Sequence, residues 1–121
     1  MRKITIYGKF PSLNQYVAAC RSNPHSGASM IQKAEKQIIK ALEGEKVLKP
    51  PLRLNYLFCE TDRRRDHDNV SAFFHKVFQD SLVKAGLLEN DGWNEIEGYR
   101  DDFTVDKHNP RIEVLIFERK K

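Results

Sequence analysis

Apolar residues alternate with polar or charged ones in three short segments, at 2–7, 52–58 and 112–116, the pattern of strands with one buried face. The first segment runs from Arg2 to Tyr7 and is broken by the glycine and proline that follow it. The second follows Pro51, and its apolar positions are Leu52, Leu54, Tyr56 and Phe58. Two more strands are expected after the turn sequences ENDGWN and DKHNP, at 96–104 and 112–116.

Two other segments repeat apolar residues every three or four positions, which predicts helices. The first helix is expected from about Ser29 to Glu43, since Gly44 can end it. The second should begin at an N-cap Asp68 or Asn69 and end near Gly86. Its apolar stripe consists of Val70, Phe73, Phe74, Val77, Phe78 and Leu82. The preceding segment 20–29, CRSNPHSGAS, is rich in turn-forming residues and is expected to be a loop.

The predicted order of elements is therefore β-α-β-α-β-β. A small mixed sheet with two helices on one face packs such elements economically, so we expect an α+β fold. The 121 residues, 40% hydrophobic and 31% charged, suit one globular domain over 1–121. The longest apolar run is far shorter than the roughly 20 residues that span a bilayer, and MRKITIYGKF lacks the apolar core of a signal peptide. We therefore expect a cytoplasmic protein without a membrane partner.

The stretch DRRRDHDN at 62–69 concentrates charges of both signs where a strand gives way to a helix. Asp66 and Asp68 lie two residues apart, so both carboxylates can reach one centre. Mg²⁺ prefers oxygen ligands and is held by one or two protein carboxylates together with water and phosphate oxygens. In the purely structural interpretation Asp68 caps the helix and Asp66 pairs with a neighbouring arginine, and the spacing alone favours that interpretation.

Asp91 and Lys76, which lie further along the chain, also bear on whether Asp66 and Asp68 bind a metal or only stabilise the fold. Asp91 lies in NDGW, where Asp-Gly is also ordinary turn chemistry. A chain that doubles back along the sheet edge would bring Asp91 beside the start of the second helix. Lys76 lies eight residues after Asp68, close to the same helical face. It could equally be a boundary residue whose stem covers apolar surface.

Basic residues surround these aspartates and give the chain a net charge of +4. Arg63, Arg64 and Arg65 form either a solvated run or a phosphate-binding group, because arginine forks match phosphate geometry. The outer face of the first predicted helix adds three lysines, Lys33, Lys36 and Lys40. A basic chain suits a partner such as nucleic acid.

Zinc is the rival metal chemistry. Cys59, His67 and His75 are the candidate ligands, but no pair of them has a recognised zinc-ligand spacing. The chain also lacks a glycine-rich phosphate loop and a Ser-His-Asp signature. A hard cation such as Mg²⁺ therefore remains the better metal hypothesis.

The combination of DRRRDHDN, VFQDSLVKAG and LLENDGW resembles the RusA family of Holliday junction resolvases, crossover junction endodeoxyribonucleases of phages and prophages. FPSLNQY and RIEVLIFE also resemble the first loop and last strand of that family, so the resemblance covers essentially the whole chain as a single RusA-like endonuclease domain. The central motifs are specific and the ends are weak. The resemblance implies a homodimeric endonuclease in a bacterial cell that needs Mg²⁺ or Mn²⁺, binds four-way DNA junctions and nicks two opposed strands.

The resemblance also implies roles for single residues. Asp66 and Asp68 resemble the paired metal-binding aspartates of the family, and Asp91 resembles the third. Lys76 resembles the catalytic lysine, and Arg65 resembles a basic residue that helps at the site. In the family's best-known form the lysine follows the aspartates one helical turn sooner. An insertion of that length moves Lys76 by about 6 Å along the helix, unless the helix begins later.

Other functions fit the same residues. The chain could be a non-catalytic DNA-binding or junction-binding module in which Arg63, Arg64, Arg65, Lys33 and Lys36 contact DNA and the aspartates only cap and pair. It could be a metal-dependent nuclease that acts on flaps or other branched DNA. It could also be a structural partner in phage replication with a decayed site. The first of these would not need a divalent metal.

Overall fold

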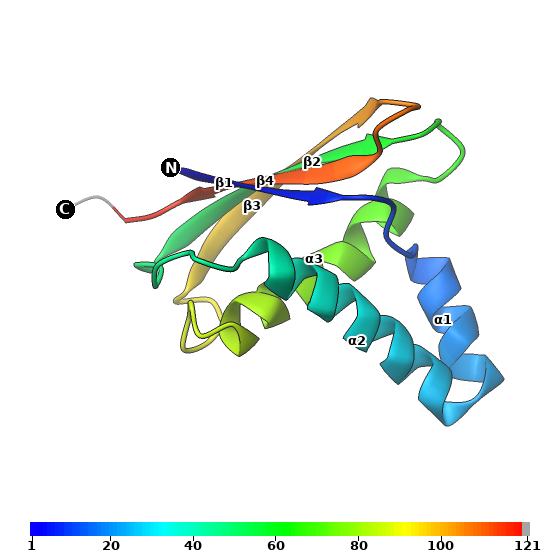
Figure 1. Ribbon diagram of the computed structural model, residues 1–121, viewed down its shortest axis with the longest axis horizontal. Helices are drawn as coiled ribbons and strands as arrows, with labels where there is room; N and C mark the ends of the chain where they lie inside the picture. Colours follow the sequence, from blue (N-terminus) through cyan, green and yellow to red (C-terminus); the bar gives the residue numbers. More distant parts are fainter. Residues whose placement is uncertain (120–121) are drawn as a thin grey trace.

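The computed structural model describes residues 1–119, which form an α+β fold of three helices and a four-stranded mixed sheet (Figure 1). The elements in chain order are β1 Arg2–Tyr7, α1 Leu13–Ser22, α2 Pro24–Ala41, β2 Leu52–Glu60, α3 His67–Lys84, β3 Ile96–Val105 and β4 Arg111–Phe117. The α+β class and the four strands were expected from the sequence. The third helix was not expected.

The strands form one open sheet in the order β1-β4-β2-β3. Strand β4 is antiparallel to both β1 and β2, whereas β2 and β3 are parallel. The parallel pair follows from α3, which leaves the end of β2 and returns the chain to the edge where β2 began. The ends of β2 and β3 therefore lie at one edge of the sheet, and their starts lie at the opposite edge.

The core fills the space between the sheet and the helices, which Figure 1 draws below the strands. Alternate strand residues are buried on one face, among them Ile6, Phe58 and Val114. The fully buried Phe74 of α3 packs its ring edge-on against Phe58, with ring centroids 5.9 Å apart. Another edge-on contact joins Phe74 to Phe10 in the segment before α1, at 5.0 Å. These contacts fix α3, and with it the residues at its start, against the end of β2.

The segment 20–29 is helical on both sides of Asn23, so the predicted loop was wrong. Helix α1 begins with a capping box, in which the Ser12 hydroxyl accepts from the Gln15 amide at 3.1 Å and the Ser12 amide donates to the Gln15 side chain at 2.8 Å. Asn23 then caps α2, which carries Pro24 at its first position. Serine, asparagine and proline serve here as helix starts, so α2 begins five residues before the predicted Ser29.

Candidate metal and nucleic-acid site

The site begins with the loop between β2 and α3, which Arg65 anchors. The Arg65 guanidinium pairs with both oxygens of Glu60, at 2.8 and 3.0 Å, and donates to the carbonyl of Phe10 at 2.8 Å. Only 18% of the Arg65 side chain is exposed. Arg65 therefore ties the loop to the segment before α1 and has little donor capacity left for a phosphate.

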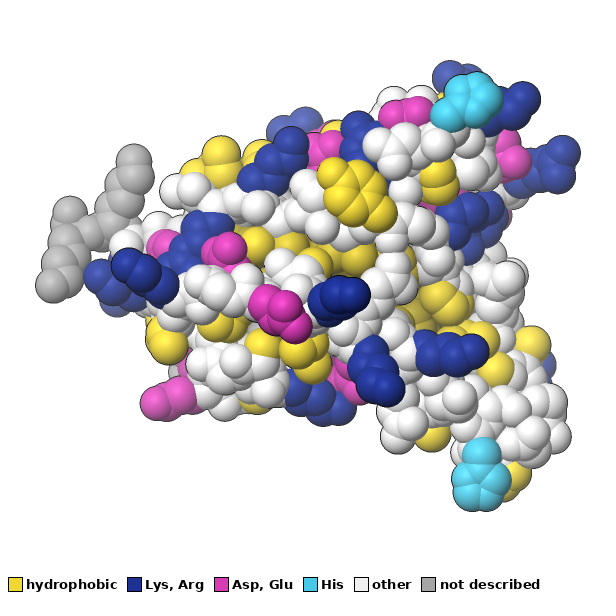
Figure 2. All heavy atoms as spheres, viewed as in Figure 1, with side chains coloured by type: hydrophobic (Ala, Val, Ile, Leu, Met, Phe, Trp, Pro, Cys, Tyr) yellow, Lys and Arg dark blue, Asp and Glu magenta, His cyan; other side chains and the backbone are white. Residues whose placement is uncertain are grey.

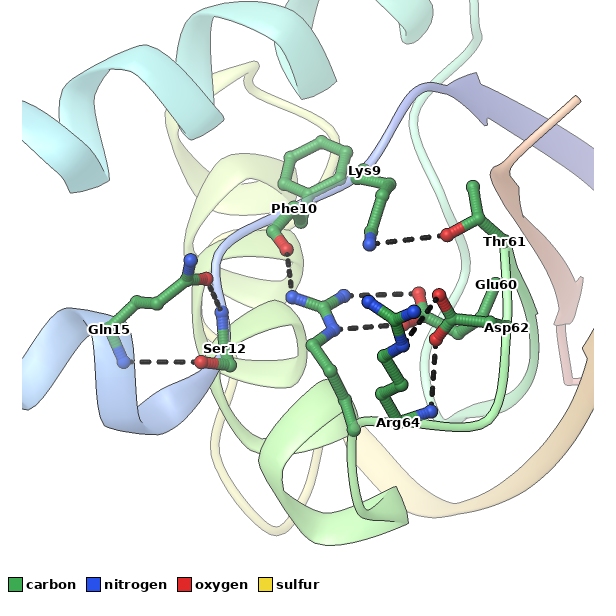
Figure 3. Close-up of polar contacts among 9 residues, drawn as sticks. Lys9, Phe10, Ser12, Gln15, Glu60, Thr61, Asp62 and Arg64 are labelled. Carbon is green, nitrogen blue, oxygen red and sulfur yellow. Dashed lines mark hydrogen bonds and ion pairs between the residues drawn. The ribbon is translucent and has the colours of Figure 1, made fainter. Parts of the chain in front are cut away.

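The other two arginines of the run face solvent. The carboxylate of Asp62 accepts from the Arg64 amide at 2.9 Å and lies 3.7 Å from the Arg64 guanidinium, as Figure 3 shows. The Arg64 side chain is nevertheless 89% exposed. Arg63 is exposed and forms no ion pair within residues 1–119. These two side chains, not Arg65, are the cations that the loop can offer to an anionic ligand.

Asp66 and Asp68 stand at the start of α3 without protein partners. Asp66 is the N-cap, with extended backbone, but its side chain makes no capping hydrogen bond. Helix α3 thus begins two residues earlier than the predicted N-cap Asp68. Both carboxylates are exposed, and neither has a hydrogen bond or ion pair within residues 1–119. The interpretation in which Asp68 caps and Asp66 pairs with an arginine does not describe this arrangement.

An N-cap carboxylate that accepts a backbone hydrogen bond normally stabilises a helix by about 0.5–2 kcal/mol, and the Asp66 carboxylate does not make this contribution. The partial positive charge at the start of α3 favours anionic groups there and offsets part of the repulsion between the two side chains. Mg²⁺ is commonly bound by one or two protein carboxylates, with phosphate oxygens and water as its remaining ligands. Asp66 and Asp68 provide two such carboxylates, both exposed and unpartnered within residues 1–119. The donor set at 66 and 68 therefore fits a hard divalent cation.

A hollow of about 370 Å³ is lined by residues on both sides of Asp66 in the chain, Arg65 and His67, but not by Asp66 or Asp68. One wall is charged and contains Glu60, Asp62 and Arg63. The lining also contains His67 and Phe103, whose rings stack with centroids 3.8 Å apart and planes 2° from parallel. The hollow can accommodate a group with polar and flat apolar parts, as a nucleotide has.

Asp91 and Lys76 lie elsewhere. The carboxyl of Asp80, on the second half of α3, has a pKa above its ordinary value because of burial, and because Asp91 hydrogen bonds to it and adds negative charge. Lys76 acts on the same pKa in the opposite direction. Asp80 follows Asp68 by twelve residues, which is about 18 Å along a helix. Asp91 and Lys76 therefore gather around Asp80 and not around Asp66 and Asp68.

The strand order explains why the aspartates do not meet within one chain. Asp66 follows the end of β2, whereas Asp91 precedes the start of the parallel strand β3. The nine residues of β2 span about 30 Å, so these two points lie at opposite edges of the sheet. Within residues 1–119 no group of three acidic, histidine or cysteine side chains could hold a metal. The predicted return of the chain to the start of α3 does not occur.

The helix start also decides between the two explanations for the position of Lys76. Helix α3 begins at His67, earlier than predicted, so a later helix start does not compensate for the insertion. Lys76 lies about 12 Å along the axis from Asp68. Its side chain is exposed. Within one chain Lys76 therefore lies about two helical turns beyond Asp68, and the carboxyl whose pKa it lowers is that of Asp80.

The candidate zinc ligands have other partners. The His75 Nε2 atom lies 2.7 Å from a carboxylate oxygen of Asp101 on β3. His67 stacks on Phe103, and burial raises the pKa of the Cys59 thiol, which disfavours the metal-binding thiolate. Within the described residues these three side chains form no cluster of metal ligands.

Replacing Asp80 by asparagine should stabilise the metal-free protein at neutral pH. A carboxyl whose pKa is raised by folding favours the folded state when protonated and costs stability once the pH exceeds that pKa. We expect Asp80→Asn to raise the melting temperature at pH 7 by a few degrees, and by less at pH 4, in thermal denaturation with EDTA. Glu89→Gln, which alters an exposed carboxylate after α3, serves as the control. A lower melting temperature for Asp80→Asn at pH 7 would contradict the assigned repulsion.

Comparison with known proteins assigns no family to this chain. No family model matches it, and no curated protein matches it. Among residues 1–119 the structure contains no helix that is both long and apolar enough to cross a membrane. The function must therefore be argued from the arrangement of the side chains.

Proposed function

We propose that this protein is a Mg²⁺-dependent endodeoxyribonuclease that resolves four-way DNA junctions by paired nicks during recombination and repair. The observation that carries the proposal is the pair of exposed carboxylates of Asp66 and Asp68, which neither cap α3 nor pair with an arginine. Two solvent-facing arginines, Arg63 and Arg64, precede them by a few residues. Acidic ligands next to exposed guanidinium groups are a combination that suits a metal-bound phosphodiester.

Each of these side chains has a defined task in the proposal. Asp66 and Asp68 would hold the ion at the start of α3. When bound there, Mg²⁺ would supply Lewis acidity toward the scissile phosphate and a more acidic water, the chemistry of hydrolysis to a 5′-phosphate product. Arg63 and Arg64 would pair with phosphates of the same strand and hold it against the loop. The neighbouring hollow of about 370 Å³ provides room for a nucleotide beside the scissile bond.

The third aspartate enters the proposal through a second copy of the chain. Asp91 sits beside Asp80, at the opposite edge of the sheet from Asp66 in its own chain. If Asp91 serves the same ion, as the family resemblance implies, the partner in a homodimer must supply it. A two-fold dimer then has two such shared sites, one for each of the two related phosphates of a junction.

Lys76 would accompany Asp91 into the shared site, because both lie close to Asp80. Its ammonium group is exposed and could stabilise the negative charge that develops on the phosphate during displacement. In this arrangement one chain supplies the two carboxylates at the start of its α3. The other chain supplies the lysine and the third carboxylate from the second half of its α3 and the turn that follows.

Cleavage of a set of DNA substrates tests the proposed function. We expect the protein to convert a four-way junction into two nicked duplexes with Mg²⁺ and to leave it intact with EDTA, while linear duplex resists cleavage. Preferential cutting of a flap would instead indicate a nuclease for other branched DNA. Binding without any metal-dependent cleavage would identify a non-catalytic module. The observation that favours a non-catalytic module is the separation of Asp91 from Asp66 within one chain.

A further inference from the structure

We infer that the outer face of α2 is a separate binding surface for the phosphate backbone of duplex DNA, formed by Lys33, Lys36 and Lys40. The inference rests on the proposed function in one respect, namely that DNA is the ligand. It extends that function by assigning a place to a duplex arm, away from the carboxylates at the start of α3.

Helical geometry places the three lysines in one row. Residues 33, 36 and 40 are separated by three and four positions, so their side chains lie within about 60° of one another around the axis. All three are exposed. The row is about 10 Å long. One DNA strand carries a phosphate for about every 3.4 Å of helix axis, so the row matches a run of about three phosphates.

The charge of the row is not neutralised by the protein. Lys33, Lys36 and Lys40 form no ion pair within residues 1–119, although many cations of this chain do. The arginines that pair with carboxylates are Arg2, Arg53, Arg64, Arg65, Arg100 and Arg111. Among residues 1–119 only Lys3 and Lys84 are lysines in ion pairs, so free ammonium groups are common in this chain. The feature that favours an external polyanion is the alignment of three of them in one row on α2.

The acidic residue of α2 does not weaken this surface. Glu35 is the single carboxylate between Pro24 and Ala41, and its side chain is only 8% exposed. Lys84 of α3 lies 2.8 Å from one of its oxygens and 2.9 Å from the other. Glu35 is thereby neutralised beneath the surface. The exposed carboxylate in the lining of the lysine groove is Glu43, which follows the end of α2 and lies beyond the last lysine of the row.

Two hollows connect the lysine row with the loop before α3. A groove of about 690 Å³ runs along α2 and contains all three lysines, with Ser29 and Gln32 as further hydrogen-bonding groups. A second hollow, of about 380 Å³, lies between α2 and the segment before α1 and is lined by both Lys33 and Lys9. The ammonium of Lys9 donates to Thr61 at 3.3 Å, next to Asp62 and Arg64 (Figure 3).

A strand that follows the row would therefore pass from α2 over Lys9 toward the exposed arginines of the loop. Figure 2 shows Lys and Arg side chains on this face, both over the helices and above them toward the sheet. The groove on α2 has no aromatic side chain among its lining residues. Base stacking is therefore not expected there, and binding along α2 should be independent of sequence.

The test compares two triple variants that remove the same charge. In the row variant, Lys33, Lys36 and Lys40 become glutamine; in the control variant, the exposed Lys46, Lys49 and Lys107 become glutamine. Binding to a short linear duplex is measured by fluorescence anisotropy in EDTA over a range of salt concentrations. For the row variant we expect affinity to fall by about tenfold or more and the slope of log K against log salt to flatten by about 2.7, or 0.9 per lost phosphate contact. The control variant should bind almost as the wild type does.

The outcomes separate this inference from the proposed function. Equal effects of the two triple variants would show that only net charge matters and would overturn the inference, as would wild-type binding by the row variant. The binding measurement in EDTA does not require cleavage. If the protein cuts no DNA but its DNA binding still depends on Lys33, Lys36 and Lys40, the proposed nuclease activity is refuted and the proposed binding surface is supported. Loss of binding to anionic vesicles, with DNA binding unchanged, would assign the row to a lipid surface. Equal melting temperatures show that all three proteins are folded.

Discussion

Asp66→Asn is expected to abolish junction cleavage while the protein still folds and binds DNA. The amide keeps the shape of the side chain but removes the negative charge that would hold the cation. Loss of a mere outer-shell partner of a metal ligand costs about 10–100-fold, so loss of a direct ligand should lower the cleavage rate by more than about a hundredfold. The measurement is single-turnover cleavage of a labelled four-way junction in Mg²⁺.

The structure makes this substitution unusually easy to interpret. The Asp66 side chain is exposed and has no partner within residues 1–119, so the change should alter stability by no more than about 0.5 kcal/mol. Asp102→Asn is a suitable control, because Asp102 is an exposed aspartate of β3 whose one side-chain partner within residues 1–119 is Arg100. We expect that control to cut at the wild-type rate. Cleavage at the wild-type rate by Asp66→Asn would remove the proposed metal site.

Much of the fold was predictable because burial follows local periodicity. The alternating residues of 2–7 and 52–58 and the apolar stripe of α3 all lie where the sequence placed them. The region around Asn23 was not predictable in the same way, because serine, asparagine and proline signal both turns and helix starts. Only tertiary contacts, such as those of the partly buried Tyr16 with Phe73, decide between the two outcomes.

The candidate site was predictable only in its local part. The spacing of Asp66 and Asp68 is a property of adjacent residues and required no knowledge of the sheet. The position of Asp91 depends on the parallel pairing of β2 with β3, which places it at the opposite edge from Asp66. The sequence did contain a signal for the true neighbour of Asp91. Asp80 follows Lys76 by one helical turn, beside the apolar stripe of α3, and was overlooked.

The role of Arg65 also could not be predicted from local sequence. Three consecutive arginines look equivalent in a sequence, and each was a candidate for binding phosphate. The fold buries one of them against Glu60 and the Phe10 carbonyl and leaves its two neighbours in solvent. Which of the three is anchored depends on where β2 ends relative to the segment before α1, and that is a tertiary relation.

The proposal that two chains share each site predicts a large effect when two inactive variants are mixed. Asp66→Asn and Asp91→Asn should each be inactive alone, because every site in either homodimer lacks one ligand. After subunit exchange, half of the dimers contain one chain of each kind. In such a mixed dimer one site carries both substitutions and the other carries none. About one quarter of all sites are then intact, and they should nick one strand of a junction.

A mixture of Asp66→Asn with Asp68→Asn is the matched control. Both residues belong to the same half of a shared site, so every site in the mixed dimer lacks a ligand and no nicking should return. Subunit exchange is verified in each mixture with two differently tagged chains.

Nicking of a four-way junction by the mixed variants is the most direct test of the proposed site. The proposal predicts nicking by the mixture of Asp66→Asn and Asp91→Asn and none by the mixture of Asp66→Asn and Asp68→Asn. Absence of nicking in both mixtures after verified exchange, or full activity of Asp91→Asn alone, would contradict it.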